Sequence, residues 1–178
     1  RYYGSLKRGR DNELTLNETY MKNKAGNSVL FGDSIQLYHL KSKKYITVLP
    51  KTLATVEREN ARIHLDPEGN QFSWFNVMPR YKVDKEGDVV ADKMELVLKA
   101  TQRTQEFIHT CEKSPGPRTY REVNCSLEAT SWCLEIFRGS DAVSDTSTLK
   151  GCEIVTMYDP ETRSSIGLGL AAGNNDED

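Results

Sequence analysis

A pattern of about 60 residues recurs along the sequence, and it constrains the fold more than any other feature. Three similar stretches begin at Gly32, Ala91 and Gly151, and each alternates apolar and polar residues: "GDSIQLYHL", "ADKMELVLK" and "GCEIVTMYD". Two Ser-Trp stretches, "FSWFNVMP" with Trp74 and "TSWCLEIF" with Trp132, recur at nearly the same spacing. Because two independent markers share one period, the chain contains duplicated structural units.

Each unit has the pattern of four short β-strands without a long helix. Alternation with period two points one set of side chains inward and the other outward. A lone hairpin is only marginally stable in water, so such units must pool their apolar faces. Three units around a pseudo-threefold axis form a β-trefoil, a barrel that removes sheet edges. We therefore predict an all-β trefoil fold in which Trp74 and Trp132 are equivalent core anchors.

Two segments lie outside the repeat. In residues 11–27, Asp11 is a candidate helix N-cap and Gly26 a candidate stop, which predicts a short helical arm near the N-terminus. Residues 139–150 are rich in Ser, Thr and Asp and poor in apolar side chains. This composition predicts a linker or an exposed loop.

Composition indicates an ordinary soluble protein. The chain has 178 residues, 37% of them apolar and 28% charged, with a formal net charge of −2. This balance gives no overall attraction to nucleic acid or to an anionic membrane, and no apolar run is long enough to span a bilayer. The opening residues, "RYYGSLKRGR", lack an initiator methionine, from which we expect a piece cut from a longer chain.

The four cysteines, Cys111, Cys125, Cys133 and Cys152, form no C-x-x-C pair and have no zinc-ligand spacing with histidine. Reduced thiols are the favoured interpretation, and a disulfide framework is the alternative. Catalytic motifs are missing as well: there is no phosphate-binding glycine loop and no nucleophile elbow. The three histidines fall in three different strand-like runs, and the carboxylates are scattered. We expect no catalytic residues, no metal site and no cofactor, and hence no enzyme.

Three lysines, Lys41, Lys43 and Lys44, crown the turn of the first hairpin, "SIQLYHLKSKKYITV". Compact cationic clusters bind phosphates, so the turn is a candidate for a weak anion site. Charged hairpin tips also commonly serve only to keep a turn in water, and this is the favoured interpretation.

Four blocks of sequence, in this order and spacing, resemble the amino-terminal region of inositol trisphosphate receptors. They are "GDSIQLYHLKSKKYITV", "ENARIHLDPEGNQFSWFNVMPRYKVDKEGD", "SWCLEIF" and "LKGCEIVTMYDPET", which together cover roughly residues 29 to 160. Ryanodine receptors share the layout but are less similar in the first hairpin. The repeats resemble the MIR type, which is also found in protein O-mannosyltransferases.

The resemblance implies a division of the chain. In that family two β-trefoils precede a helical domain, and the first trefoil, the suppressor domain, lowers ligand affinity and passes the binding signal to a tetrameric calcium channel. By this resemblance, residues 1–28 would be a helical arm and linker, and residues 29–139 the second and third lobes of the first trefoil. Residues 140–150 would be a linker, and residues 151–178 would open a second trefoil; the alternative is that the third repeat, from Gly151, completes the first trefoil in place.

The resemblance also implies a role and a location. The chain would be a cytosolic regulatory region of a channel gated by inositol trisphosphate, at the endoplasmic reticulum membrane. Its partners would be other domains and neighbouring subunits of a homotetramer, and inositol trisphosphate and calcium would be ligands of the parent channel. Tyr81, followed by Lys82, matches a tyrosine that touches neighbouring domains in the family; the alternative is a tyrosine packed on its own trefoil. The family's Thr-Thr-Gly-Arg-like ligand loop has no match here, so we assign no ligand contact and place the ligand site mostly downstream.

Other classes remain open. One alternative is a ryanodine-receptor-like regulatory domain, which would act without the inositol ligand. Another is a luminal MIR module of a protein O-mannosyltransferase, which predicts sugar on Asn17 or Asn124 and possible disulfides. A carbohydrate-binding lectin would need aromatic and carboxylate pairs in every lobe, whereas Trp74 and Trp132 are the only repeated aromatics.

Overall fold

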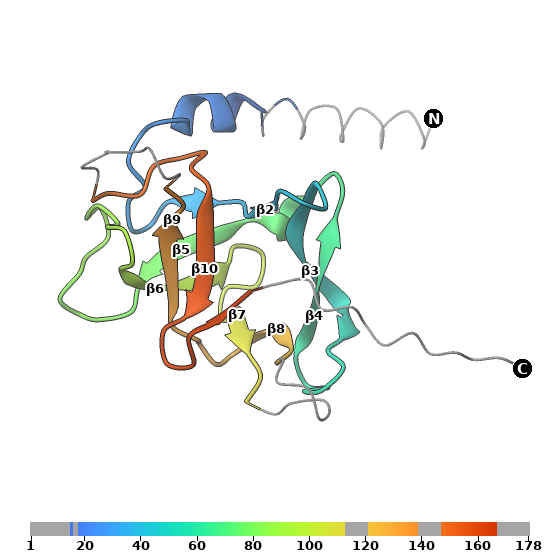
Figure 1. Ribbon diagram of the computed structural model, residues 1–178. Coiled ribbons are helices and arrows are strands. Elements are labelled where there is room, and N and C mark those ends of the chain that lie inside the picture. The colour runs from blue at the N-terminus through green and yellow to red at the C-terminus, as the bar shows by residue number, and fades with distance from the viewer. Residues whose placement is uncertain (1–14, 16–17, 113–120, 139–146, 167–178) are drawn as a thin grey trace, which may run out of the picture.

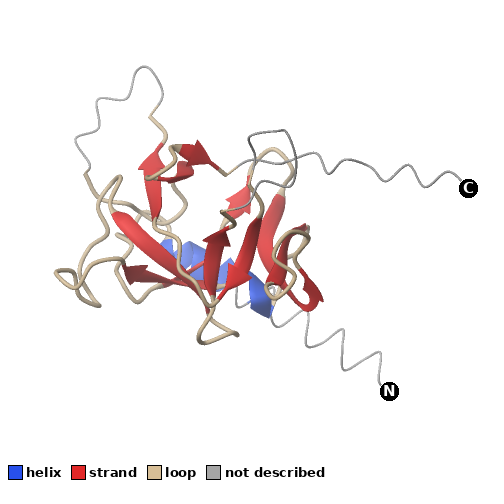
Figure 2. Ribbon diagram, turned by 90° about the horizontal axis from the view of Figure 1, so that it is seen from below, coloured by secondary structure: helices blue, strands red, loops and turns tan. Residues whose placement is uncertain are grey.

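The computed structural model describes residues 15, 18–112, 121–138 and 147–166. In this part of the chain the strands join in one eleven-stranded sheet that curls into a half-barrel (Figures 1 and 2). The strands are β1 (Ser34–Ile35), β2 (Tyr38–His39), β3 (Lys44–Leu53), β4 (Ala61–Asp66), β5 (Phe75–Pro79), β6 (Glu95–Ala100), β7 (Phe107–Thr110), β8 (Val123–Ser126), β9 (Trp132–Ile136), β10 (Val155–Asp159) and β11 (Ser164–Ser165), and a 3-10 turn, η1, covers Gln71–Ser73. The all-β prediction is confirmed.

A helical segment lies across one end of the half-barrel (Figure 1). Residues 18–24 are helical, and Gly26 follows with φ at 72°, a conformation that favours glycine and ends the helix. The predicted cap Asp11 lies outside the described residues. Within the described ranges, no helix has the length and apolar character needed to cross a membrane.

Residues that alternate between apolar and polar in the sequence also alternate in how deeply their side chains are buried. On β5, Phe75 and Val77 are fully buried, whereas Asn76 and Met78 between them are only half-buried. The inward side chains of all three units pack into one hydrophobic cluster, which includes Leu96 and Leu98 of β6. Burying these apolar surfaces is the main favourable contribution to folding, at about 25 cal/mol per Å².

Equivalent turns confirm the repeat. Lys43 in the first unit and Arg163 in the third have nearly the same left-handed backbone conformation, with φ of 56° and 57°. The Lys43 N–H donates to the His39 carbonyl at 2.9 Å, and the Arg163 N–H donates to the Asp159 carbonyl at 2.8 Å. The two hairpin tips therefore share one geometry, two repeat periods apart.

Strand pairing shows how the units fit together. We call β1, β6 and β10 the opening strands, since each begins a unit, and β5 and β9 the closing strands, since each ends one. Closing strand β5 pairs with β1 and β6, and closing strand β9 pairs with β6 and β10, all antiparallel. Opening and closing strands therefore alternate around the half-barrel. The remaining antiparallel pairs are β2–β3, β3–β4, β4–β8, β7–β8, β6–β7 and β10–β11.

The register of these pairs corrects the prediction for the tryptophans. Ile35 lies opposite Phe75 in the first unit, and Leu96 lies opposite Trp132 in the second. Phe75 is thus the counterpart of Trp132, and both are buried. Trp74 comes one residue earlier, and a shift of one residue turns a side chain to the other face of a strand. Trp74 is only half-buried, so the prediction that both tryptophans are equivalent core anchors was wrong.

Each tryptophan has its own partners. The Trp132 indole N–H donates to the Ile108 carbonyl at 3.0 Å inside the core. The Trp74 ring meets the Tyr20 ring edge to face, with 5.2 Å between centroids, so it holds the helical segment against the sheet.

The third unit shares the sheet of the first two. Strand β10 pairs with β9, and Leu149 and Met157 belong to the same hydrophobic cluster, which fits the alternative in which the third repeat joins the first trefoil. An unpaired strand edge readily pairs with a further strand. Strand β10, whose apolar and polar residues alternate, pairs with the free edge of β9. Residues 139–146, most of the predicted linker, and residues 167–178 lie outside the described residues.

The register correction can be tested by stability. Phe75→Ala and Trp132→Ala should each lower the free energy of unfolding by about 3–5 kcal/mol, as expected for a buried aromatic side chain. Trp74→Ala should cost only about 0.5–1.5 kcal/mol, the scale of one aromatic pair. Urea unfolding measures how much each of the three substitutions lowers the free energy of unfolding. If Trp74→Ala lowered it as much as Phe75→Ala, the register would be contradicted.

Candidate interaction surface

Tyr81 lies in the loop between β5 and β6 and presents its ring to solvent, with 53% of the residue exposed. Its hydroxyl donates to Glu95 Oε2 at 2.9 Å, and the Ser131 hydroxyl donates to the same oxygen at 2.7 Å. Lys82 and Val83 follow in the loop and are exposed. The ring is therefore held from the sheet side while its face stays free for a contact.

The hydrogen bond to Glu95 raises the pKa of Tyr81, and the charges of Glu95 and of Glu161 act in the same direction. At neutral pH the phenol therefore keeps its proton and remains the donor. A tyrosine fixed by a hydrogen bond loses little conformational entropy when a partner covers it, and tyrosine is enriched at protein interfaces.

The three lysines lie at the tip of the β2–β3 hairpin. Lys41 and Lys43 are exposed, and Lys44 is half-buried at the start of β3. The tip is closed by His39, whose Nδ1 lies 2.8 Å from Ser42 Oγ and accepts from the Ser42 N–H at 3.2 Å. These contacts make His39 part of the hairpin turn.

The other histidines lie in separate surroundings. His64 Nε2 is 4.0 Å from Asp66 Oδ2 on β4, and His109 is buried on β7. The described part of the chain brings no three His, Cys, Asp or Glu side chains together in an arrangement that would hold a metal ion.

Sequence reasoning missed a polar cluster that joins the first two units. The Asn124 and Asn60 side chains each donate to Glu57 Oε2 at 2.9 Å, and His109 Nε2 lies 3.6 Å from the same oxygen. Burial by itself would raise the pKa of Glu57, but the hydrogen bonds from Asn124 and Cys111 and the nearby His109 bring it below the usual value. In the sequence, the only sign of this cluster was that polar residues occupy inward-facing positions of strands.

The cysteines form no disulfide. Cys111, Cys125 and Cys133 are buried, and burial raises the pKa of the Cys125 thiol to about 12. Cys152 is exposed beside the helical segment, with its sulfur 4.0 Å from the Met21 carbonyl oxygen.

Comparisons with known proteins now give the family. The family model of the inositol 1,4,5-trisphosphate/ryanodine receptor matches residues 6–142. The chain belongs to this receptor family. Within it, the chain is 31% identical over 96% of its length to the inositol 1,4,5-trisphosphate receptor itr-1 of Caenorhabditis elegans, and it spans 6% of that relative's length. The resemblance to inositol trisphosphate receptors found in the sequence is confirmed.

Solved structures agree on the fold. The SDF2-like protein of Arabidopsis thaliana superposes with a TM-score of 0.63 over 78% of this chain and 76% of its own, at 20% identity. The protein O-mannosyltransferase Pmt1-Pmt2 complex of S. cerevisiae gives the same TM-score over 83% of this chain and 22% of its own, at 16% identity. At these identities the likeness concerns the fold alone.

The polar cluster predicts a pH dependence. A depressed pKa means that ionised Glu57 contributes stability that is present above its unfolded pKa near 4.5 and is lost as the pH falls through the lower folded value. Glu57→Gln should therefore lower the free energy of unfolding at neutral pH and have a smaller effect near about pH 3. Urea unfolding at both values measures this.

The matched control is Glu128→Gln, because the Glu128 side chain also approaches His109 but is 81% exposed. It should change stability little at either pH. A Glu57→Gln loss of the same size at both values would contradict the assigned role of the ionised carboxylate.

Proposed function

We propose that the chain is part of the cytosolic amino-terminal regulatory region of a calcium-release channel gated by inositol trisphosphate, and that it couples ligand binding to gating. The family match is the observation that carries this proposal. The exposed Tyr81 loop supports it, because a fixed aromatic ring beside Lys82 suits a contact with a neighbouring domain. The role is regulatory and not enzymatic.

The ligands, partners and membrane location that we propose are those of the parent channel. Inositol trisphosphate and calcium are ligands of that channel, and the partners of this chain are neighbouring domains and subunits of a homotetramer. The channel lies in the endoplasmic reticulum membrane, with this region on its cytosolic face. The relative in C. elegans, which is named as an inositol 1,4,5-trisphosphate receptor, supports this extension. Inositol trisphosphate binds mainly to residues downstream of this chain.

Among the alternatives, the luminal mannosyltransferase module fits less well. It predicted sugar on Asn17 or Asn124; Asn17 lies outside the described residues, and Asn124 is fully buried and donates to Glu57. It also allowed disulfides, whereas none of the four cysteines forms one. A ryanodine-receptor-like regulatory domain remains the second candidate, since the matching family model covers both receptors.

The coupling role is tested in the full receptor that contains this segment. Tyr81→Ala should raise the inositol trisphosphate concentration for half-maximal calcium release by about fivefold or more, the lower end of ordinary allosteric coupling. Glu95→Gln keeps the ring but weakens its fixed orientation, so it should act in the same direction and less strongly. Leu127→Ala, at another exposed apolar residue, is the control. An unchanged dose response for Tyr81→Ala would refute the proposed contact.

The placement of the ligand site is tested on the 178-residue chain itself. Titration with labelled inositol trisphosphate should show no submicromolar binding. Replacing Lys41, Lys43 and Lys44 together by Gln should leave this result and the stability nearly unchanged, because exposed charges interact weakly in water. Submicromolar affinity that the triple variant loses would instead make the hairpin tip the ligand site.

A further inference from the structure

The tip of the β2–β3 hairpin carries a local charge of opposite sign to that of the whole chain. Residues 34–56 contain four lysines and no aspartate or glutamate, whereas the chain as a whole has a formal net charge of −2. Three of these lysines, Lys41, Lys43 and Lys44, lie within four residues at the turn, and Lys41 and Lys43 are exposed. The tip is therefore a compact cationic patch on a slightly acidic molecule.

An apolar side chain lies among these charges. Leu40 precedes Lys41 in the turn, and 56% of the residue is exposed. Keeping a turn in water explains the lysines but not an exposed leucine, because exposed apolar surface is unfavourable in water. Cations around an apolar side chain are the composition that binds to an anionic bilayer, since the apolar group enters the acyl boundary and the cations stay at the headgroups.

The third unit shows that the fold does not require this composition. The β10–β11 hairpin tip has the same backbone geometry as the β2–β3 tip. When the two tips are aligned on that geometry, the third unit has Pro160 in place of Leu40 and Glu161 in place of Lys41. Pro160 is half-buried, whereas Leu40 is exposed. The leucine and the lysines are thus not needed to form the turn.

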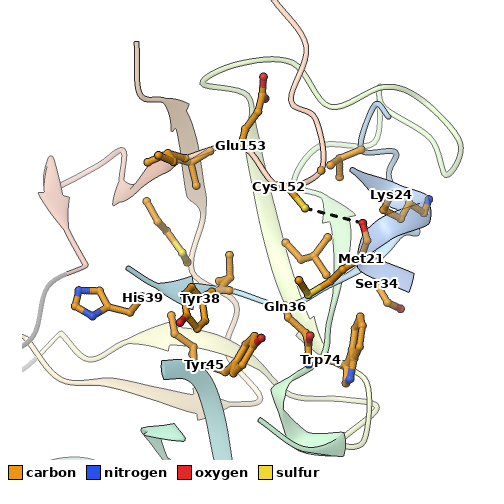
Figure 3. A pocket seen from close by; sticks show the side chains of 18 of the residues that line it. Met21, Lys24, Ser34, Gln36, Tyr38, His39, Tyr45, Trp74, Cys152 and Glu153 are labelled. Atoms are coloured by element: carbon orange, nitrogen blue, oxygen red, sulfur yellow. Dashed lines mark hydrogen bonds between the residues drawn. The ribbon is translucent and has the colours of Figure 1, made fainter. Parts of the chain in front are cut away.

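The tip is held in one conformation by its own contacts. Lys43 is in the left-handed region, and its N–H donates to the His39 carbonyl at 2.9 Å. The His39 ring also lies 2.8 Å from Ser42 Oγ. At the base of the hairpin the Tyr38 and Tyr45 rings pack with 4.9 Å between centroids, beside the pocket that this hairpin borders (Figure 3). A turn ordered in advance loses little conformational entropy when it binds.

The positive charge of the tip is not neutralised within the protein. In the part of the chain that the structure describes, no ion pair joins the three lysines to a carboxylate. Asp66 lies opposite Tyr45 in the register, but its Oδ1 accepts from the N–H groups of Glu68 and Gly69, each at 2.9 Å. Asp66 therefore stabilises its own turn, and the lysine charges remain available to an external partner.

We propose that the tip of the β2–β3 hairpin binds the surface of an anionic lipid bilayer. The lysines lie at the level of the lipid phosphates, and Leu40 enters the boundary between the headgroups and the acyl chains. Binding through one tip is weak and reversible, because each lysine near an anionic surface strengthens it only about fivefold and stable anchoring takes more than one signal. The inference does not depend on the channel function.

Vesicle co-sedimentation of the 178-residue chain tests the proposal. The probe is a vesicle of equal parts phosphatidylcholine and phosphatidylserine, and a pure phosphatidylcholine vesicle is its control. The chain should sediment with the anionic vesicles only. Binding should be stronger at about 0.01 M than at about 0.15 M ionic strength, because the Debye length shortens from about 30 Å to about 8 Å.

Lys43→Gln and Arg163→Gln are a matched pair, because each removes one exposed charge from the same backbone position of two equivalent tips. Lys43→Gln should lower the vesicle affinity about fivefold, whereas Arg163→Gln should leave it unchanged. Leu40→Ala should lower it about tenfold at either ionic strength, because lost apolar burial is not screened by salt. All three residues are exposed, so urea unfolding should show that each variant is as stable as the parent chain.

The same measurements can contradict the proposal. Absence of binding, equal sedimentation with both kinds of vesicle, equal losses for Lys43→Gln and Arg163→Gln, or an unchanged affinity of Leu40→Ala would overturn it. So would binding of soluble glycerophosphoserine as strong as that of the vesicle, since the tip would then be a site for a free phosphate group. A soluble glutamate-rich peptide that bound more tightly than the vesicle would make an acidic protein the partner and would also overturn it.

Discussion

The antiparallel pairing of a closing strand with the opening strands on its two sides is the interaction on which the rest of the structure depends. It places Phe75 and Trp132 at equivalent inward positions and carries the sheet from one unit to the next. The same pairing fixes where β10 lies and so brings the third unit into the common core. Since side chains alternate strictly along a strand, one register sets which residues are buried in the whole half-barrel.

Much of this architecture could be read from the sequence. The 60-residue period and the alternation gave the strands and the repeated hairpins, because both are local properties of the chain. Trp74 could not be placed in this way. The shared letters Ser-Trp aligned it with Trp132, whereas only the pairing partner Ile35 shows that Phe75 takes that position. Register is a long-range property, and a match of two letters does not determine it.

The functional residues also divide into those that the sequence could predict and those that only the three-dimensional structure shows. Tyr81 and Lys82 could be proposed from the resemblance, but the carboxylate that fixes the phenol, Glu95, lies on another strand and became visible only in three dimensions. The Glu57 cluster was missed for the same reason, since its members come from a loop and two strands far apart in sequence. The Glu57 cluster thus joins the first two units internally, whereas the Tyr81 loop faces outward and is tied to β6 through Glu95.

The different surroundings of the four thiols make the chain a convenient object for spectroscopy. Alkylation requires the thiolate, and a thiol whose pKa is near 12 hardly forms it at neutral pH. Cys125 is therefore protected by its ionisation as well as by burial, and Cys111 and Cys133 are shielded by the fold. A maleimide dye would attach at Cys152 in the native protein without any substitution. A fluorophore there would report on the helical segment next to it, while labelling of the other three would signal unfolding.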